Sequence, residues 1–328
     1  MGRVLESTQS VGNTALQARW ILLGSMTSFA RALMSWRLRT RTLELGRRTL
    51  VMGVINITAD SFSDGGNFLD PQAAIAHALK LIDDGADMLD LGAESTRPGS
   101  LAGIPGQAAV GAEDEQARLL PVIECVLAAR PGTVLSVDTY KSATARAVLA
   151  AGVEIINDVS GFTWDEALPS VCAKSGCGVV LMHTRGRPDE WRAQPKLPAD
   201  TLLDSVHAGL ARSLDTAMRA GINRESVVLD LGYGFGKKLD ENYVLLARQA
   251  EFLALDRPLL TGVSRKSFLG HTLSALHEGK QAPVEAREIA SLAALVTAIL
   301  HGASIVRVHD VRPAVEAARI ADAVLAAT

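Results

Sequence analysis

Eight short apolar runs in the sequence each end at, or just before, a polar side chain that could do chemistry. These side chains are Asn56, Glu94, Asp138, Asn157, His183, Asp230, Lys266 and His309. A lone Asp or Asn at the end of a strand is often a helix N-cap, and this alternative stays open for Asp138 and Asn157. Core packing would not select polar residues at all of these ends, so we expect the side chains to converge on one site.

Three of these side chains are rich in hydrogen-bond acceptors. The carboxylates of Asp138 and Asp230 can each accept two parallel N–H donors, and the amide of Asn157 can both donate and accept. Together they fit the amino-amide edge of a flat heterocycle such as a pterin or a guanine. The sequence therefore predicts a polar ring as one part of the ligand.

Basic side chains near the same strand ends could hold an anion. They are Arg97, Arg265, Lys266, Arg307 and His309. Arg307 and His309 are two residues apart and so point to the same face of a strand, which favours a functional role for His309 over that of a core histidine. The predicted ligand is thus a polar ring joined to a phosphate.

From residue 49 onward, short apolar runs alternate with longer amphipathic segments, which is typical of parallel strands covered by helices. The predicted strands span residues 50–56, 88–94, 134–139, 154–158, 179–183, 227–231, 259–264 and 305–309. The predicted helices lie near residues 71–84, 113–129, 142–151, 166–174, 199–220, 242–255, 284–301 and 314–326. Without a second zone of composition, this pattern favours a (β/α)8 TIM barrel in one α/β domain over an open, doubly wound sheet with a companion domain.

Glycines follow five of the predicted helices, at the position where a left-handed residue commonly ends a helix. They are Gly85, Gly152, Gly176, Gly221 and Gly302. This repeated helix-to-strand turn supports the barrel. The chemistry of such a barrel lies at the carboxyl ends of its strands, where the polar side chains stand.

Residues 1–47 precede the predicted barrel, which spans residues 48–328. The first 48 residues carry eight Arg against Glu6 and Glu44, which could indicate a targeting or surface-binding arm. We favour a flexible extension, or a chain that truly starts at Met26 or Met34.

Composition and charge exclude several classes of partner. A formal net charge of −3 provides no broad field for nucleic acid, and no apolar run is long enough to span a membrane. Cys125, Cys172 and Cys177 are odd in number and form no C-x-x-C pair, which argues against a disulfide framework or a zinc site. We expect a cytoplasmic protein with small-molecule partners.

Seven segments carry local sequences that coincide with the predicted strand ends. They are residues 53–66 (GVINITADSFSDGG), 90–99 (DLGAESTRPG), 136–139 (SVDT), 156–161 (INDVSG), 230–237 (DLGYGFGK), 264–267 (SRKS) and 307–310 (RVHD). In this order they resemble the dihydropteroate synthases, which are pterin-binding enzymes, over roughly residues 48–328. The resemblance implies a transferase of folate biosynthesis with Mg²⁺ as its cofactor.

The resemblance also implies a role for individual residues. Pterin contacts are implied for Asp138, Asn157, Met182, Asp230 and Lys266. Pyrophosphate contacts are implied for Asn56, Arg97, Arg307 and His309, with Asn56 as the metal ligand. The implied p-aminobenzoate contacts are Phe62, Thr96, Arg97, Pro98, Phe235, Lys266 and Ser267. The implied catalytic residues are Asp138, Asp230, Lys266, Arg307 and His309, while His183 could serve only as a wall of the pocket.

The implied reaction joins 6-hydroxymethyl-7,8-dihydropterin pyrophosphate to p-aminobenzoate by a dissociative, SN1-like route. Pyrophosphate leaves the pterin first, and the amino group of p-aminobenzoate then attacks the cation. Two loops, residues 58–66 and 95–99, resemble the mobile loops that close over the site in this family. Positioning and electrostatic stabilisation would carry such chemistry.

The sequence departs from the family pattern around these loops. Ala59 and Leu231 replace prolines, and Ala93 replaces a glycine. Residues 100–112 look like an insertion after the second loop. Loss of a proline loosens the backbone, so loop closure and sulfonamide sensitivity stay open.

Two other functions remain possible from the sequence. A pterin-barrel methyltransferase would share the acidic and amide contacts but would not need the basic residues. A catalytically silent paralogue, kept as a binding subunit, should have lost some of the functional groups. The resemblance also implies a homodimer through the last helices. The small residues at 290–298 do not decide this, because they could equally pack against the chain's own barrel.

Overall fold

Parallel strands close into an eight-membered barrel in the part of the chain that the structure describes. This computed structural model describes residues 31–57, 71–96, 100–104 and 110–327. The barrel strands are β3 (Leu50–Asn56), β4 (Met88–Gly92), β5 (Val134–Asp138), β6 (Ile155–Asp158), β7 (Gly178–Met182), β8 (Val227–Asp230), β9 (Leu259–Thr261) and β10 (Ala303–Val308). Each pairs with the next strand along the chain, and β10 closes the ring on β3. The predicted barrel is confirmed.

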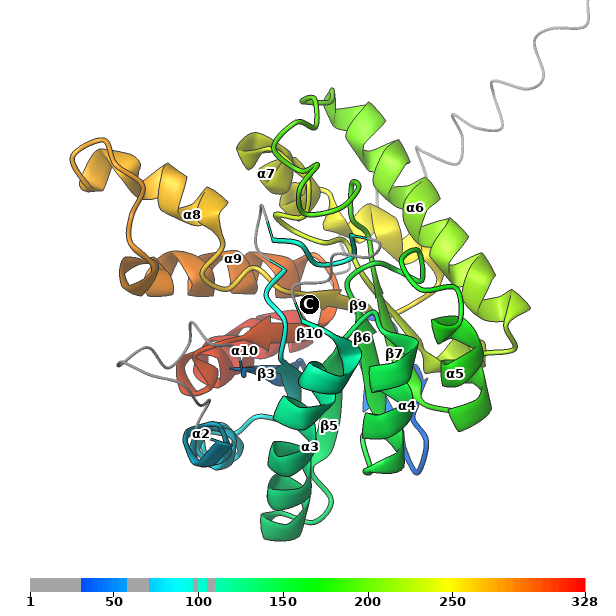
Figure 1. Ribbon diagram of the computed structural model, residues 1–328. Helices are drawn as coiled ribbons and strands as arrows, with labels where there is room; N and C mark the ends of the chain where they lie inside the picture. The colour runs from blue at the N-terminus through cyan, green and yellow to red at the C-terminus, as the bar shows by residue number, and fades with distance from the viewer. Residues whose placement is uncertain (1–30, 58–70, 97–99, 105–109, 328) are drawn as a thin grey trace, which may run out of the picture.

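Helices surround the barrel and cover the outer faces of its strands (Figure 1). They are α2 (Pro71–Asp83), α3 (Ala112–Ala129), α4 (Ser142–Ala150), α5 (Leu168–Ser175), α6 (Ala199–Arg219), α7 (Leu239–Ala247), α8 (Ser267–Thr272), α9 (Glu288–Leu300) and α10 (Val311–Ala326). Short 3-10 segments join some of them, namely η2 (Arg224–Ser226), η3 (Gln249–Leu255), η4 (Leu273–Leu276) and η5 (Val284–Arg287). Buried residues such as Leu119 and Val206 pack the helices against the strands.

The helices differ most from the prediction between residues 239 and 300. The helix predicted at residues 242–255 begins earlier, as α7, and its second half is the 3-10 segment η3. The helix predicted from residue 284 starts as η5 and becomes α-helical only at Glu288, while α8 was not predicted. A six-residue helix is too short to show the 3.6-residue period on which the prediction relied.

Alternate residues of each strand point into the barrel and divide its interior into two layers. The layer at the amino-terminal end is apolar and consists of Met52, Met88, Val134, Ile155, Val180, Val228, Leu260 and Ile305. Two residues further along five of the strands, the same face carries Asp90, Ser136, Asn157, Asp230 and Arg307. The alternation therefore places a polar layer above an apolar floor.

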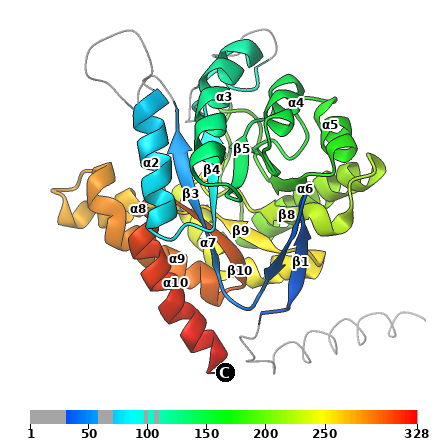
Figure 2. The same ribbon diagram turned by 90° about the horizontal axis from the view of Figure 1, so that it is seen from below.

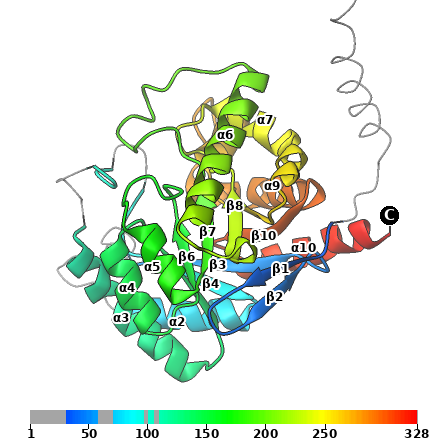
Figure 3. The same cartoon turned by 90° about the vertical axis from the view of Figure 1, so that its right-hand side faces the viewer.

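A β-hairpin closes the amino-terminal end of the barrel (Figures 2 and 3). Its antiparallel strands β1 (Met34–Arg37) and β2 (Thr42–Leu45) precede the first barrel strand. Trp36, Leu38 and Leu45 are at most 3 % exposed and pack directly on the apolar floor. The indole N–H of Trp36 donates to the carbonyl of Ser226 at 3.0 Å.

This hairpin corrects the prediction that residues 1–47 form a flexible extension. Trp36, Leu38 and Leu45 of this segment are part of the barrel core, and the charged residues between them hid this from the sequence pattern. Gly178 makes room for the hairpin, because a Cβ there would lie 2.5 Å from the side chain of Leu38. Residues 1–30 lie outside the described part of the chain.

The predicted helix-to-strand turns are confirmed. Gly85, Gly152, Gly176, Gly221 and Gly302 all have positive φ angles, between 68° and 108°. Each turn brings the chain from a helix back to the amino-terminal end of the next strand.

Among the described residues, no helix has the length and apolar character that crossing a membrane requires.

Replacement of Trp36 by Ala should destabilise the whole barrel. The change removes a fully buried indole and its hydrogen bond from the floor, and such losses cost about 3–5 kcal/mol. Urea unfolding followed by circular dichroism measures the change in the free energy of unfolding. As a control, Leu33→Ala removes a side chain that is 66 % exposed and should change it by less than about 0.5 kcal/mol. An equally small effect at Trp36 would contradict a structural role for the hairpin.

Candidate functional site

The polar layer at the carboxyl-terminal mouth of the barrel gathers charged groups from most of the strands. Its centre is Asp90, which β4 places inside the barrel with 0 % of its surface exposed. Asp90 accepts hydrogen bonds from Ser136 Oγ at 2.6 Å and from Asn157 Nδ2 at 2.9 Å. Arg307 Nε donates to Oδ2 of Asp90 at 2.6 Å, the same oxygen that accepts from Asn157. One buried carboxylate thus links β4, β5, β6 and β10.

Arg307 connects this centre to Asp138. Its Nη2 lies 3.1 Å from Asp138 Oδ2, so the guanidinium bridges two carboxylates. Burial opposes the charge of Arg307, but Asp90 and Asp138 raise its pKa above the usual value. Burial raises the pKa of Asp138 to about 7, although Arg307 acts to lower it. Asp138 therefore changes charge near neutral pH.

Asp230 lies at the end of β8 and is 7 % exposed. Its Oδ1 accepts the backbone N–H of Gly232 at 2.7 Å. Burial raises the pKa of Asp230, while the Gly232 bond and the nearby charges of Lys266 and Lys237 counter the rise. The other oxygen of its carboxylate can accept N–H donors from a ligand.

Lys266 stands beside Asp230 and follows β9. Its Nζ lies 4.1 Å from the centre of the Phe235 ring, in a cation–π contact. Burial and the charge of Arg307 lower the pKa of Lys266 to about 8, while Asp230 and Asp138 act to raise it. These mutual effects place Asp138, Asp230, Lys266 and Arg307 in one electrostatic unit.

An apolar wall borders this unit. Met182 at the end of β7 is 4 % exposed and packs in a cluster with Tyr140 and Val159. Phe235 packs against the same cluster. Such a combination of flat apolar surface with a few placed polar groups suits an aromatic or heteroaromatic ligand.

His183 follows Met182 and is 7 % exposed. Burial lowers its pKa well below 6.5, and its Nδ1 has no hydrogen-bond partner among the described residues. A Cβ at Gly209 would lie 2.4 Å from the ring of His183, so this ring packs against α6, on the strand face opposite to Met182. The expectation that His183 converges with the other strand-end side chains, or walls their pocket, is therefore corrected.

His309 and Arg265 lie on the side of the mouth formed by β9 and β10. His309 Nδ1 is 3.0 Å from Ser264 Oγ, which orients the ring. Arg265 Nη2 lies 2.6 Å from Asp310 Oδ1, in a pair whose two side chains are 37 % and 35 % exposed. Arg265 was predicted as a hydrogen-bond donor to an anion, but the structure pairs it with Asp310.

The remaining predicted contacts lie at the rim or outside the described part. Asn56 ends β3 and is exposed, Ser267 is exposed at the start of α8, and Thr96 is half-buried. Phe62, Arg97 and Pro98 fall outside the described residues, as does Ala59.

The segment predicted as an insertion packs onto the mouth where it is described. Ala102 is fully buried, and the backbone N–H of Gly103 donates to the hydroxyl of Tyr140 at 2.9 Å. A Cβ at Gly103 would come within 2.4 Å of the Trp164 ring, so only glycine fits. This segment shapes the rim beside the apolar wall.

Two buried groups of the mouth were missing from the predicted site residues. Asp90 lies two residues inside its strand, between leucines, and so does not look like a strand end. Lys141 Nζ lies 2.5 Å from Glu94 Oε2 and 3.3 Å from Glu115 Oε2, and the three side chains form an ion-pair cluster behind the mouth. Only Glu94 of this cluster was singled out from the sequence, because the other two stand at helix starts.

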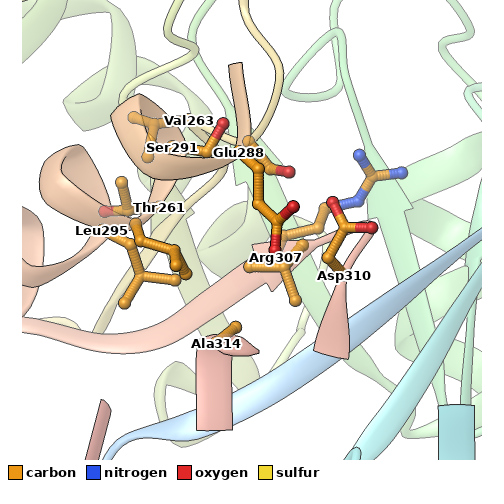
Figure 4. A pocket seen from close by; sticks show the side chains of 11 residues that line it. Thr261, Val263, Glu288, Ser291, Leu295, Arg307, Asp310 and Ala314 are labelled. Atoms are coloured by element: carbon orange, nitrogen blue, oxygen red, sulfur yellow. The ribbon is translucent and has the colours of Figure 1, made fainter. Parts of the chain in front are cut away.

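A cavity of about 10 Å³ lies behind Arg307, between β9 and β10 on one side and α9 and α10 on the other (Figure 4). Thr261, Leu295 and Ala314 line it. Its volume holds about one water molecule, far less than a small-molecule ligand needs. The cavity therefore belongs to the packing between strands and helices.

The described residues contain no cluster of three or more His, Cys, Asp or Glu side chains that could hold a metal by themselves. The exposed amide of Asn56 is a hard oxygen ligand at the mouth. This arrangement fits a cation that a substrate would hold in large part, with one protein ligand.

Comparisons with known proteins show the family to which the chain belongs. A family model described as pterin binding enzyme matches residues 52–309. The dihydropteroate synthase of Escherichia coli strain K12 is 42 % identical over 277 residues, which cover 84 % of this chain and 92 % of that protein.

Solved structures show the same likeness. A Yersinia pestis dihydropteroate synthase with a sulfonamide drug superposes with a TM-score of 0.79 at 38 % identity, covering 90 % of this chain and 100 % of that one. A Xanthomonas albilineans dihydropteroate synthase in complex with 7,8-dihydropteroate superposes with a TM-score of 0.74 at 37 % identity. The match covers 88 % of this chain and 98 % of that one. The chain therefore belongs to the dihydropteroate synthases, a family of pterin-binding transferases.

Proposed function

We propose that this enzyme condenses 6-hydroxymethyl-7,8-dihydropterin pyrophosphate with p-aminobenzoate and releases pyrophosphate. The observation that carries the proposal is the electrostatic unit of Asp138, Asp230, Lys266 and Arg307 beside an apolar wall. The complex of the Xanthomonas albilineans relative with 7,8-dihydropteroate supports the identity of the product.

The ring would bind to the acidic and amide groups. The carboxylates of Asp138 and Asp230 would accept the N–H donors of the pterin edge, and Met182 would pack against its face. Asn157 donates to Asp90 through Nδ2, so its amide oxygen is oriented to accept from the ligand. This distribution favours a ring that carries positive charge.

The leaving pyrophosphate would bind to Arg307, His309 and Asn56, with Arg97 from the predicted second loop. The bonds of Arg307 to Asp90 and Asp138 take two of the five N–H donors of a guanidinium. His309 is held by Ser264 on the next strand. Mg²⁺ bound at Asn56 would neutralise part of the charge of the pyrophosphate.

In the proposed reaction the bond between the pterin methylene carbon and the pyrophosphate oxygen breaks first. Both electrons leave with pyrophosphate, and the methylene carbon becomes part of a cation that Asp138 and Asp230 stabilise electrostatically. The amino nitrogen of p-aminobenzoate then donates its lone pair to this carbon and releases a proton. Phe62, Thr96, Pro98, Phe235, Lys266 and Ser267 are proposed to hold p-aminobenzoate.

Pyrophosphate release from the purified enzyme tests the proposed function directly. We expect dihydropteroate and pyrophosphate to form in equal amounts only when both substrates and Mg²⁺ are present. Binding of the pterin substrate without turnover would instead indicate a catalytically silent paralogue.

Replacement of Asp230 by Asn should reduce turnover far more than it weakens p-aminobenzoate binding. The change keeps the shape but removes the negative charge next to the proposed cation, which should lower kcat on the order of 10²–10³-fold. Steady-state kinetics with each substrate varied in turn measures both effects. Asp215→Asn, the same change in an exposed ion pair of α6, serves as the control. Near-normal turnover of Asp230→Asn would rule out the assigned role.

The activity should depend on pH through Asp138 and Lys266. Asp138, with a pKa of about 7, takes up a proton as the pH falls, and Lys266, with a pKa of about 8, loses one as the pH rises. We therefore expect kcat/KM for the pterin substrate to fall below about pH 7 and above about pH 8. In Lys266→Arg the alkaline fall should become smaller, because a guanidinium stays charged and only the buried Lys237, whose pKa burial lowers to about 7, still loses a proton in this range. An unchanged alkaline limb in that variant would exclude Lys266 as its source.

We also propose a homodimer through α9 and α10. Ile289 and Ile320 on these helices are 83 % and 69 % exposed, so they are available for an apolar contact between two subunits. Light scattering should give a mass near twice the 34.7 kDa of the chain. The double variant Ile289→Asp, Ile320→Asp should be monomeric. The control variant Leu276→Asp should stay dimeric, because Leu276 lies outside these helices. A monomeric wild-type protein would contradict this proposal.

A further inference from the structure

The turn that follows β8 carries two groups of the proposed site and contains three glycines. Asp230 stands before it and Phe235 within it. Gly232, Gly234 and Gly236 have φ angles of 69°, 85° and 71°, in the left-handed region that glycine tolerates best. A turn with so many glycines needs other contacts to keep one conformation.

Lys237 supplies such contacts from the end of the turn. Its Nζ donates to the carbonyl oxygens of Gly232 at 2.8 Å, His183 at 3.0 Å and Phe235 at 3.3 Å. The side chain is buried, and the residue is 7 % exposed. An ammonium group has three N–H donors, and each of these carbonyls takes one.

The charge of Lys237 matters for this arrangement. Burial lowers the pKa of Lys237 to about 7, while the carboxylate of Asp230 acts to raise it. A neutral amine has only two N–H donors, so all three bonds can be made only by the ammonium form. The negative Asp230 and the tied turn therefore support each other.

The tied turn determines where the site groups stand. A Cβ at Gly232 would lie 2.0 Å from the carbonyl oxygen of His183, so the turn packs directly on the end of β7. Phe235, whose carbonyl binds Lys237, makes an edge contact with Trp191 and supports Lys266 on its ring face. A shift of this turn would thus move Phe235 and Lys266 together.

We propose that Lys237 is a positioning residue of the pterin site, which ties the carbonyls of His183, Gly232 and Phe235 together and so fixes Asp230, Phe235 and Lys266 for the reaction. The inference rests on the proposed function. A purely structural role would predict a loss of stability without a specific loss of substrate recognition.

The test compares Lys237→Met with Trp36→Ala. Methionine has a similar length but no donor, and the Trp36 variant lowers stability at the opposite end of the barrel. At a temperature where both variants are fully folded, kcat/KM for the pterin substrate should fall on the order of a hundredfold in Lys237→Met. It should stay within about twofold of wild type in Trp36→Ala. A value within about twofold of wild type in folded Lys237→Met would overturn the proposal, as would an equal fall in both variants.

Amide hydrogen exchange gives a second readout that needs no substrate. Lys237→Gln keeps two N–H donors and is the variant to use if Lys237→Met does not fold. In the folded Lys237 variant, amide exchange at Gly234 and Phe235 should be at least about tenfold faster than in wild type, while exchange in β3 should not change. Unchanged exchange in the turn would overturn the proposal. If wild-type enzyme makes no dihydropteroate, the proposed function fails, and the exchange result still decides whether Lys237 fixes the turn.

Discussion

The buried ion pair between Arg307 and Asp90 is the interaction on which the site depends. A carboxylate with 0 % exposure cannot stay charged in the barrel without partners, and here a guanidinium, a hydroxyl and an amide provide them. Asn157 gives an N–H to Asp90, which fixes the orientation of its amide. Arg307 also reaches Asp138 and acts to lower its pKa against the larger effect of burial.

The two layers of the barrel give this network a firm base. Apolar residues from every strand form the floor, and the hairpin with Trp36 closes it from below. Water is thus kept away from the lower side of Asp90, where it would weaken the ion pair. Acidic and basic groups are interleaved above the floor, so that Arg307 belongs to both the proposed ring site and the proposed pyrophosphate site.

The sequence predicted the barrel, and it placed Asp138, Asn157 and Asp230 at strand ends, because strand alternation and strand ends leave clear patterns. Asp138, Asn157 and Asp230 each close an apolar run, and the glycine turns repeat after the helices. Asp90 was missed as a site residue because it lies inside a strand, and its partners come from strands distant in sequence. The hairpin and the three bonds of Lys237 were also missed, since tertiary packing alone creates them.

A double-mutant cycle on the free energy of unfolding tests the central role of the ion pair most directly. Asp90→Ala takes from Arg307 one of its two carboxylate partners, and Arg307→Ala leaves the buried Asp90 without a charged partner, so each should cost up to about 3–5 kcal/mol. The double variant removes both charges, so its loss should fall short of the sum of the single losses by at least about 2 kcal/mol. Additive losses would contradict the account, because they would mean that the two residues act independently.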